Sequence, residues 1–231
     1  RSRASTNAPS RNADRMGGHA SVSFRKPDPD RFRRNRQLVV AKWHTWNFAG
    51  DPMGDGYFAN FYAQLRNYWS ISGVAHAGRW VYSDRLTRGG PMMRAPGFTA
   101  VSAGIDGDER KPVVWELGGS YETRPDGSWS ADGGFELKFR PLPTFSLEIG
   151  PTFKRELTAS QYVRAVTDAE AAAMYGRRYV FGALDQKEFG METRLNLILS
   201  PRMSLQMYLQ PLLSTGRYTG FKEAAQPRNP V

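Results

Sequence analysis

Apolar side chains recur at every second position along most of the chain from about His19 onward. In the clearest run, residues 133–140, the apolar Phe135, Leu137 and Phe139 alternate with three charged residues. A period of two is typical of a β-strand with one apolar and one polar face, whereas a helix repeats every 3.6 residues. The pattern therefore predicts an all-β fold.

About ten such runs follow one another, and they share bulky apolar residues on one side with small, polar or charged residues on the other. Several exceed the usual ~5–6 residues of a strand in a soluble protein and fit the ~9–11 residues of a tilted membrane strand. The predicted strands are 19–26, 36–48, 57–66, 69–82, 97–106, 112–122, 128–140, 144–158, 178–199 and 203–219.

The connections between these runs alternate in length. Longer ones are expected at 49–56, 83–97 and 159–177, with 124–127 as the short member of that series. Short turns at one end and long loops at the other are typical of an outer-membrane β-barrel. The short turns are expected at 67–68, 107–111, 141–143 and 200–202.

Two architectures use strands of this kind. In a soluble sandwich or lipocalin-like barrel the apolar face points inward, whereas in a membrane barrel it meets lipid and the polar face lines the interior. Aromatic residues near the expected strand ends, such as Trp43, Trp69 and Trp80, match the aromatic girdles of membrane barrels. We expect an antiparallel up-and-down transmembrane β-barrel, with the lipocalin-like ligand binder as an alternative.

Charge is concentrated at one end of the chain. Residues 1–36 hold ten Lys or Arg and three Asp, which accounts for seven of the ten net positive charges. Residues 1–18 are also poor in apolar side chains, so they predict a disordered basic segment and no nucleic-acid-binding surface. The chain has no cysteine, which excludes disulfides and Cys-based metal or catalytic sites.

Charged side chains of both signs fall on the expected polar face. They predict a charge-balanced network in a barrel lumen, and the alternative is a membrane-embedded hydrolase that uses two of the carboxylates as acid and base. The residues of this network are Glu116, Glu136, Lys138, Arg140, Glu148, Glu192 and Arg194.

Other chemistry has little support. The three histidines lack metal-ligand spacing, and no phosphate-binding loop or nucleophile elbow occurs. His76 shares a strand face with Ser70 and Ser72, but no third residue orients a Ser–His pair. Residues 51–55 and 106–109 are incomplete calcium loops. We expect no metal and no cofactor.

Two loops carry specific features. Arg85, Arg88 and Arg94 lie in the loop 83–97, where they would bind an anion or lipopolysaccharide phosphates unless the loop is only a stiff turn. Residues 167–170 form a capping box that predicts a short helix over Ala171–Tyr175, ended by Gly176.

Five segments carry a family resemblance: 85–91 (Arg-Leu-Thr-Arg-Gly-Gly-Pro), 175–181, 184–186, 200–206 and 216–223. In this order they resemble the C-terminal barrel domain of an uncharacterised bacterial outer-membrane family, over about Tyr57 to Glu223. In that family the barrel follows a carbohydrate-binding, family-nine-like sandwich, and no catalytic residues are established.

The resemblance implies a bacterial outer-membrane location, contact with lipid or lipopolysaccharide, and carbohydrate recognition through a module outside this chain. The upstream sandwich is missing and the chain stops where the family continues, so we expect a piece truncated at both ends. Ten strands would close a small barrel or form part of a larger one.

The expected organisation is a basic segment (1–18), a barrel domain (19–223) and a tail (224–231). The barrel is expected to act as a membrane anchor or pore without catalysis of its own. The hydrolase and the lipocalin-like binder remain the alternatives, and the sequence does not specify an oligomeric state.

Overall fold

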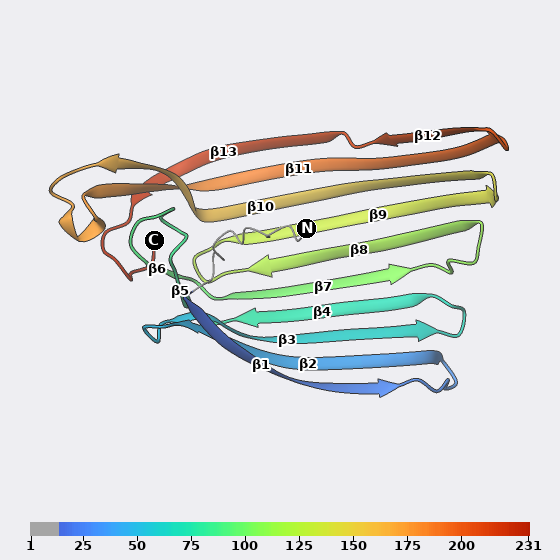
Figure 1. Ribbon diagram of the computed structural model, residues 1–231, viewed down its shortest axis with the longest axis horizontal. Helices are drawn as coiled ribbons and strands as arrows, with labels where there is room; N and C mark the ends of the chain where they lie inside the picture. The colour runs from blue at the N-terminus through green and yellow to red at the C-terminus, as the bar shows by residue number, and fades with distance from the viewer. Residues whose placement is uncertain (1–13) are drawn as a thin grey trace, which may run out of the picture.

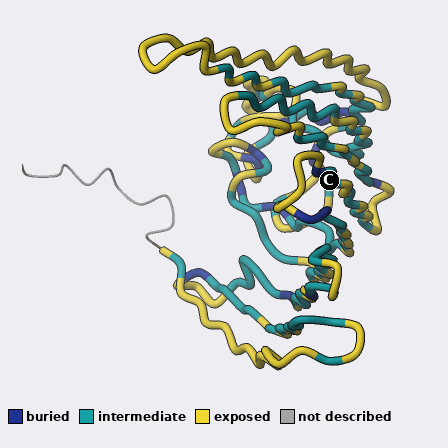
Figure 2. Tube along the Cα trace, turned by 90° about the vertical axis from the view of Figure 1, so that its right-hand side faces the viewer, coloured by how far each residue is buried: buried dark blue, intermediate teal, exposed yellow. Residues whose placement is uncertain are grey.

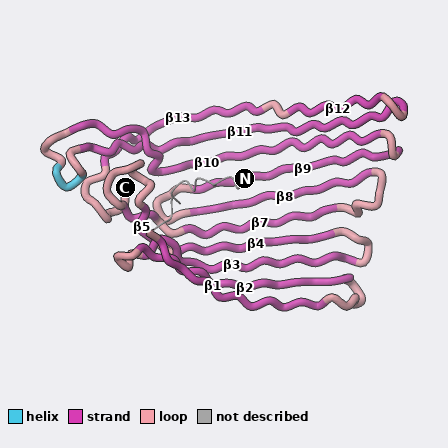
Figure 3. The backbone as a smooth tube through the Cα atoms, viewed as in Figure 1, coloured by secondary structure: helices cyan, strands magenta, loops and turns pink. Residues whose placement is uncertain are grey.

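The computed structural model describes residues 14–231, which form one long, curved antiparallel sheet and a separate two-stranded hairpin (Figures 1 and 3). The prediction of an all-β, antiparallel fold is confirmed. In chain order the strands are β1 (Arg15–Lys26), β2 (Arg33–Asn47), β3 (Pro52–Leu65), β4 (Ser70–Gly78), β5 (Val81–Ser83), β6 (Met93–Ala95), β7 (Phe98–Asp106), β8 (Val113–Thr123), β9 (Trp129–Leu142), β10 (Phe145–Thr167), β11 (Arg177–Ser200), β12 (Met203–Leu209) and β13 (Leu212–Glu223).

Each strand of the large sheet pairs with its neighbours in the chain, except that β7 follows β4 because the β5–β6 hairpin leaves the sheet. Strands β12 and β13 pair with successive parts of β11. They form one row interrupted at Pro211, whose ring removes a backbone donor. The sheet therefore has ten rows of strand, which matches the ten predicted runs.

The sheet is not closed into a barrel. Strand β1 pairs only with β2, and the row of β12 and β13 pairs only with β11. Figure 2 shows the sheet as an open curve with these two edges far apart. The antiparallel sheet is thus as predicted, whereas the predicted barrel, either small and closed or part of a larger one, is not confirmed, because closure depends on curvature, which alternation does not determine.

Several boundaries differ from the prediction. Strand β1 begins at Arg15, inside the segment expected to be disordered, and residues 1–13 of that segment lie outside the described residues. Strands β10 and β11 extend into the expected loop 159–177 and leave only 168–176 as a loop. The expected strand 69–82 ends at Gly78, and the expected loop 49–56 is a tight turn at 48–51 because β3 begins at Pro52.

The predicted helix 171–175 is a single 3₁₀ turn, η1 (Ala172–Met174), without a side-chain cap. Asp168 Oδ1 accepts the backbone N–H of Glu170, and the other carboxylate oxygen binds Arg178. Asp168, which lies inside the predicted capping box, thus serves a local turn and an ion pair. Tyr175 and Gly176 have positive φ angles (57° and 69°), which end the turn.

The buried core lies at one end of the sheet. It joins Met93 of the hairpin, Met174 of the 3₁₀ turn, Tyr179 and Phe181 of β11, and Ala224 of the C-terminal segment. Phe181 and Met93 are fully buried. Figure 2 shows the C-terminus on the concave side of the sheet, and the hairpin joins the same core through Met93. The core therefore forms between one end of the sheet and these two segments, and not between two sheets.

Residues 224–231, expected to be a tail, are tied to distant parts of the chain. Arg228 donates to both carboxylate oxygens of Asp51 at 2.7 and 2.9 Å, and its backbone N–H donates to Met92 O at 2.8 Å. The carbonyl oxygen of Val231 accepts from Ser160 and Lys222. The segment therefore links β13 to the turn between β2 and β3.

No helix within residues 14–231 has the length and apolarity needed to cross a bilayer.

Replacement of Phe181 by Ala tests whether this small core stabilises the fold. Because the ring is fully buried against Tyr162 and Met93, we expect Phe181→Ala to lower the free energy of unfolding by about 3–5 kcal/mol. Phe48→Ala, in an exposed turn, is the control and should change it by less than about 0.5 kcal/mol. Urea unfolding followed by tryptophan fluorescence gives both values, and equal effects would contradict this location of the core.

Candidate functional site

The outer, convex face of the sheet is apolar from edge to edge. The register aligns one row of small and apolar side chains across the first six rows of strand, and a second row crosses β8 to β12. The first contains Val22, Val40, Ala59, Ala75, Val101 and Tyr121, and the second Val113, Phe139, Leu147, Leu195 and Met207. We call this surface the apolar belt.

No described residue forms a second layer over the apolar belt. Val101 is 50% exposed, Phe135 41% and Phe139 39%. Large apolar side chains in a soluble domain are normally covered, and a continuous exposed patch marks a contact with a partner or a membrane. The belt is therefore the first candidate functional surface.

Polar and aromatic groups lie along the strands beyond the belt. Towards the end that carries the core, the Asp55 carboxylate contacts Lys42 at 3.0 Å and lies within 3.5 Å of His44 and Arg79. At the opposite end Trp69 and Trp115 pack edge to face, 4.9 Å between ring centroids. Aromatic and charged borders of this kind are found where a membrane strand meets the headgroup region.

The inner, concave face of β7 to β11 is rich in charge. From the short turns up to the level of Glu156 and Glu188, its carboxylates outnumber its cations nine to four, although the whole chain carries a net charge of +10. The carboxylates are Asp106, Glu116, Glu122, Asp132, Glu136, Glu148, Glu156, Glu188 and Glu192. The cations are Lys138, Arg140, Lys154 and Arg194.

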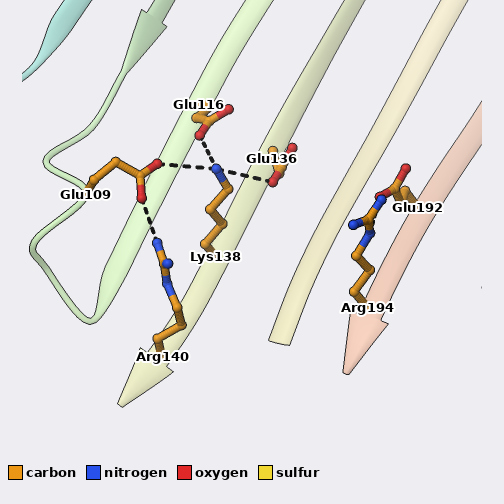
Figure 4. A network of polar contacts seen from close by, with 7 residues as sticks. All are labelled: Glu109, Glu116, Glu136, Lys138, Arg140, Glu192 and Arg194. Carbon is orange, nitrogen blue, oxygen red and sulfur yellow. Dashed lines mark hydrogen bonds and ion pairs between the residues drawn. The ribbon is translucent and has the colours of Figure 1, made fainter. Parts of the chain in front are cut away.

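Lys138 on β9 joins the predicted network (Figure 4). Its ammonium contacts Glu116 on β8, lies 3.6 Å from Glu136 Oε1, and reaches Glu109 in the β7–β8 turn at 3.3 Å. Arg140 binds Glu109 at 2.7 Å and not the strand carboxylates. One lysine thus serves three carboxylates, and Glu116 and Glu136 are directly opposite each other in the register.

The remaining predicted members are separate from this group. Arg194 pairs with Glu192 on the same strand at 2.6 Å, and Glu192 also accepts from Tyr208 at 3.5 Å. Glu148 stands across the ladder from both Lys138 and Arg194, but no described side chain forms a hydrogen bond or ion pair with it. The predicted network is therefore a cluster, a pair and a free carboxylate.

The sequence reasoning missed Glu109, which it placed in an incomplete calcium loop. Partial burial raises the pKa of this carboxyl, but hydrogen bonds from Arg140 and Lys138 outweigh it and hold the pKa below the usual value. The neighbouring Asp108 accepts hydrogen bonds from Nε and Nη2 of the Arg110 guanidinium, which lowers the pKa of Asp108 to about 2. One sequence signal could have identified Glu109: it lies in an acidic turn at the same end of the sheet as the two cations of β9, Lys138 and Arg140.

A cavity of about 310 Å³ opens on the concave face beside the network. Its floor is a row of glycines, because Gly104, Gly118 and Gly134 are directly paired across three strands. A Cβ at Gly134 would lie 3.2 Å from the Thr152 methyl group, so side chains there would narrow the cavity. Carboxylates border it, including Glu148 and Glu192.

A larger cavity of about 1080 Å³ lies at the end that carries the core, between the β5–β6 hairpin and the wall of the sheet. Trp80 and Arg94 line it from the hairpin side, and Glu122 and Glu156 from the sheet. Both carboxylates already have ionic partners, Arg124 at 2.6 Å and Lys154 at 2.6 Å. The hairpin thus narrows this end of the concave space without filling it.

The predicted arginine loop has a mainly structural arrangement. The Arg88 guanidinium lies 4.8 Å from the Tyr162 ring centre, and that of Arg94 lies 4.1 Å from the Trp80 ring centre. The Arg85 backbone N–H binds the Ser83 hydroxyl. Thr87 closes the loop by donating to Pro91 O at 2.8 Å. Two of the three guanidiniums therefore stack on different rings.

The weaker candidates are not assembled into sites. Ser72 and His76 are four residues apart on one strand, about 13 Å, which is too far for a Ser–His hydrogen bond. His76 packs against Phe58 instead, 4.8 Å between ring centroids. Asp51 and Asp55 of the incomplete calcium loop bind Arg228 and Lys42.

Within the part of the chain that the structure describes, no group of three or more His, Asp or Glu side chains is placed to hold a metal ion. Comparison with known proteins adds no assignment. No protein family, no curated protein sequence and no solved structure gives a significant match to this chain. The function is therefore inferred from the two faces of the sheet.

The ion pair between Glu109 and Arg140 should depend on pH in a defined direction. Because its folded pKa is lowered, ionised Glu109 stabilises the fold fully above its ordinary pKa of 4.5, and the contribution is lost as pH falls through the lowered value. In a double-mutant cycle with Glu109→Gln and Arg140→Gln, we expect a coupling of about 0.2–1 kcal/mol at pH 7, since both groups are solvent-accessible.

The same cycle measured at pH 3 should give a coupling closer to zero. Arg194→Gln combined with Glu109→Gln serves as the control, because Arg194 pairs with Glu192, and should show no coupling at either pH. A Glu109–Arg140 coupling that grows on acidification would contradict this assignment.

Proposed function

We propose that the chain is a membrane-embedded β-sheet domain of a bacterial outer membrane, forming part of the wall of an anchor or pore, without catalysis of its own. The apolar belt is the observation that carries this proposal. Most of its side chains are exposed and the others half-buried on the convex face from β1 to β12, while the ionic network lies on the concave face. Lipid would cover the belt, and water would fill the concave side.

Backbone chemistry supports the same assignment. A chain that crosses a bilayer must satisfy its N–H and C=O groups within its own structure, which a hydrogen-bonded sheet does along all its inner strands. Strands β2, β3 and β8 to β11 have 11 to 24 residues. Tilted strands of this length span a hydrocarbon core and extend past it.

The two alternatives have weaker support. A lipocalin-like binder would enclose its apolar side chains, but here Phe135 and Phe139 are on the exposed face. A hydrolase of the glycosidase type needs one protonated and one ionised carboxyl. Glu116 and Glu136 instead both form ion pairs with the Lys138 ammonium, so both carboxylates already have an ionic partner. The carbohydrate-recognising module expected from the family resemblance would lie outside this chain.

A charge placed on either face of the same strand tests the proposal. Val101 lies in the belt in the middle of β7, and the next residue, Ser102, has its side chain on the concave face. In lipid vesicles we expect Val101→Arg to lower the free energy of unfolding by about 2–4 kcal/mol, because arginine would enter hydrocarbon. Ser102→Arg, which adds the same charge next to water, should have a much smaller effect.

Urea unfolding in phosphatidylcholine vesicles measures both variants. If the belt faced water, Val101→Arg would behave as an ordinary surface substitution, within about 0.5 kcal/mol. Equal and small effects of the two arginines would therefore contradict the membrane assignment.

A pore and an anchor differ in conductance. If the concave face lines a water-filled path, its excess of carboxylates should make that path cation-selective. In planar bilayers with a tenfold KCl gradient we expect a reversal potential of cation sign, reduced by Glu148→Gln and unchanged by Glu170→Gln in the loop 168–176. An inserted chain that does not conduct would favour the anchor, and anion selectivity would contradict this view of the lumen.

A further inference from the structure

Three short turns lie together at the end of the sheet opposite the core (Figure 1). They are residues 27–32 between β1 and β2, 66–69 between β3 and β4, and 107–112 between β7 and β8. Arg66 joins the first two turns, because its Nε donates to Asp30 O at 2.8 Å and its backbone N–H donates to Phe32 O at 3.1 Å. These two turns therefore form one surface.

Tyr68 connects the third turn to this surface. The guanidinium carbon of Arg34 lies 3.9 Å from the Tyr68 ring centre, and that of Arg110 lies 3.1 Å from it. Two guanidinium groups cannot share one face of the ring at these distances, so the ring lies between them. Tyr68 also has a positive φ angle of 68°, which is uncommon for a bulky residue. The turn thus adopts an unfavourable backbone conformation in which one ring holds two cations.

The surface carries an excess of positive charge. Residues 25–36, 66–69 and 107–112 contain nine Lys or Arg and four Asp or Glu. Three of these carboxylates, Asp30, Asp108 and Glu109, already accept hydrogen bonds or ion pairs. Lys26 and Arg34 have no carboxylate partner within residues 14–231. Their charges are therefore open to an anionic ligand.

Two of the cations stand where the apolar belt ends. Lys26 of β1 is directly opposite Arg36 of β2, and the next pair on the same face is Phe24 with Leu38. Residues two apart in a strand share a face, so Lys26 and Arg36 are on the convex face with Val22. Phe24 is 62% exposed. The convex face therefore changes from apolar to cationic within one step of the register.

We propose that Lys26, Arg34 and Arg36, which we call the basic collar, bind the phosphate of an anionic glycerophospholipid whose acyl chains lie on Phe24 and Leu38. Arginine presents paired N–H donors that match phosphate oxygens, and basic pockets beside a membrane-spanning surface bind anionic head groups. Strands added beside β1 would not cover the collar, because its lysine and Arg36 lie on the convex face.

This inference rests on the proposed membrane function, which also selects the lipid. The short turns of an outer-membrane barrel lie on the periplasmic side. The leaflet on that side consists of glycerophospholipids, whereas lipopolysaccharide occupies the outer leaflet. The collar therefore gives the apolar belt a preference for one head group at one of its borders.

Lipid titration followed by native mass spectrometry tests the collar. The folded chain in detergent micelles receives dioleoylphosphatidylglycerol or dioleoylphosphatidylcholine. We expect the first phosphatidylglycerol to bind at least about tenfold more tightly than phosphatidylcholine. Lys26→Gln combined with Arg34→Gln should lower the phosphatidylglycerol affinity by at least about fivefold, the effect of one cation at a membrane surface. Phosphatidylcholine binding should not change.

Lys42→Gln combined with Arg155→Gln is the matched control. It removes the same two charges, but each of these cations already contacts a carboxylate, Asp55 at 3.0 Å and Asp185 at 3.4 Å. The phosphatidylglycerol affinity should therefore stay at the unsubstituted value. Equal losses in the two double variants would show a response to net charge alone and would overturn the site.

Tyr68 is expected to act as a positioning residue for Arg34. Tyr68→Ala should reduce the preference for phosphatidylglycerol over phosphatidylcholine severalfold, and Tyr68→Phe should restore it, because phenylalanine keeps the ring between the two guanidiniums. A purely structural role in the turn would lower stability without changing this preference.

Competition identifies the source of the phosphate. Excess inorganic phosphate should not displace phosphatidylglycerol, because it lacks the acyl chains, and displacement would contradict a lipid site. Tighter binding of lipopolysaccharide, or equal binding of the two phospholipids, would also overturn the proposal. Flotation with phosphatidylcholine vesicles tests the membrane function separately. A chain that floats but shows no head-group preference contradicts the collar alone, and one that prefers phosphatidylglycerol in micelles but does not float contradicts the membrane function alone.

Discussion

Antiparallel pairing in a nearly unbroken register is the constraint on which the rest of this structure depends. Adjacent residues in a strand point to opposite faces, so a shift of one residue would move a whole row of side chains to the other side. The register holds Val22, Val101 and Tyr121 in one apolar row and sets Glu116 opposite Glu136 in the polar one. The two chemically distinct faces follow from that pairing.

The concave face shows how such a sheet tolerates opposed carboxylates. Like charges that face each other across a ladder destabilise it, and Glu116 and Glu136 are such a pair. The ammonium of Lys138, two residues along β9, lies between them and reaches Glu109 as well (Figure 4). The network therefore supports the pairing of β8 with β9, and the face stays acidic because its carboxylates outnumber its cations.

The sequence predicted what is repeated locally and missed what is formed at long range. Alternation located the ten rows of strand and placed Lys138 with Glu116 and Glu136 on one face. It did not separate Val81–Ser83 from β4, because the alternation of side chains continues from one segment to the other and the two short strands resemble a single long one. It could not reveal the Arg228–Asp51 pair, whose partners are 177 residues apart, or the core around Phe181.

The distant contacts also explain why the sheet is open. Alternation is satisfied equally by a flat, a curved or a closed sheet, so curvature is decided by what lies on the concave side. Here the hairpin and residues 224–231 occupy that side. Asp84 pairs with Arg15 of β1, and Arg228 pairs with Asp51 in the adjacent turn between β2 and β3, while the Val231 carbonyl oxygen accepts from Ser160 of β10 and Lys222 of β13. The material that gives the fold its only buried core among the described residues thereby keeps β1 away from β13. The segments that stabilise the single chain therefore oppose closure of its ten rows of strand on themselves, whereas a barrel with more strands would leave room for these segments.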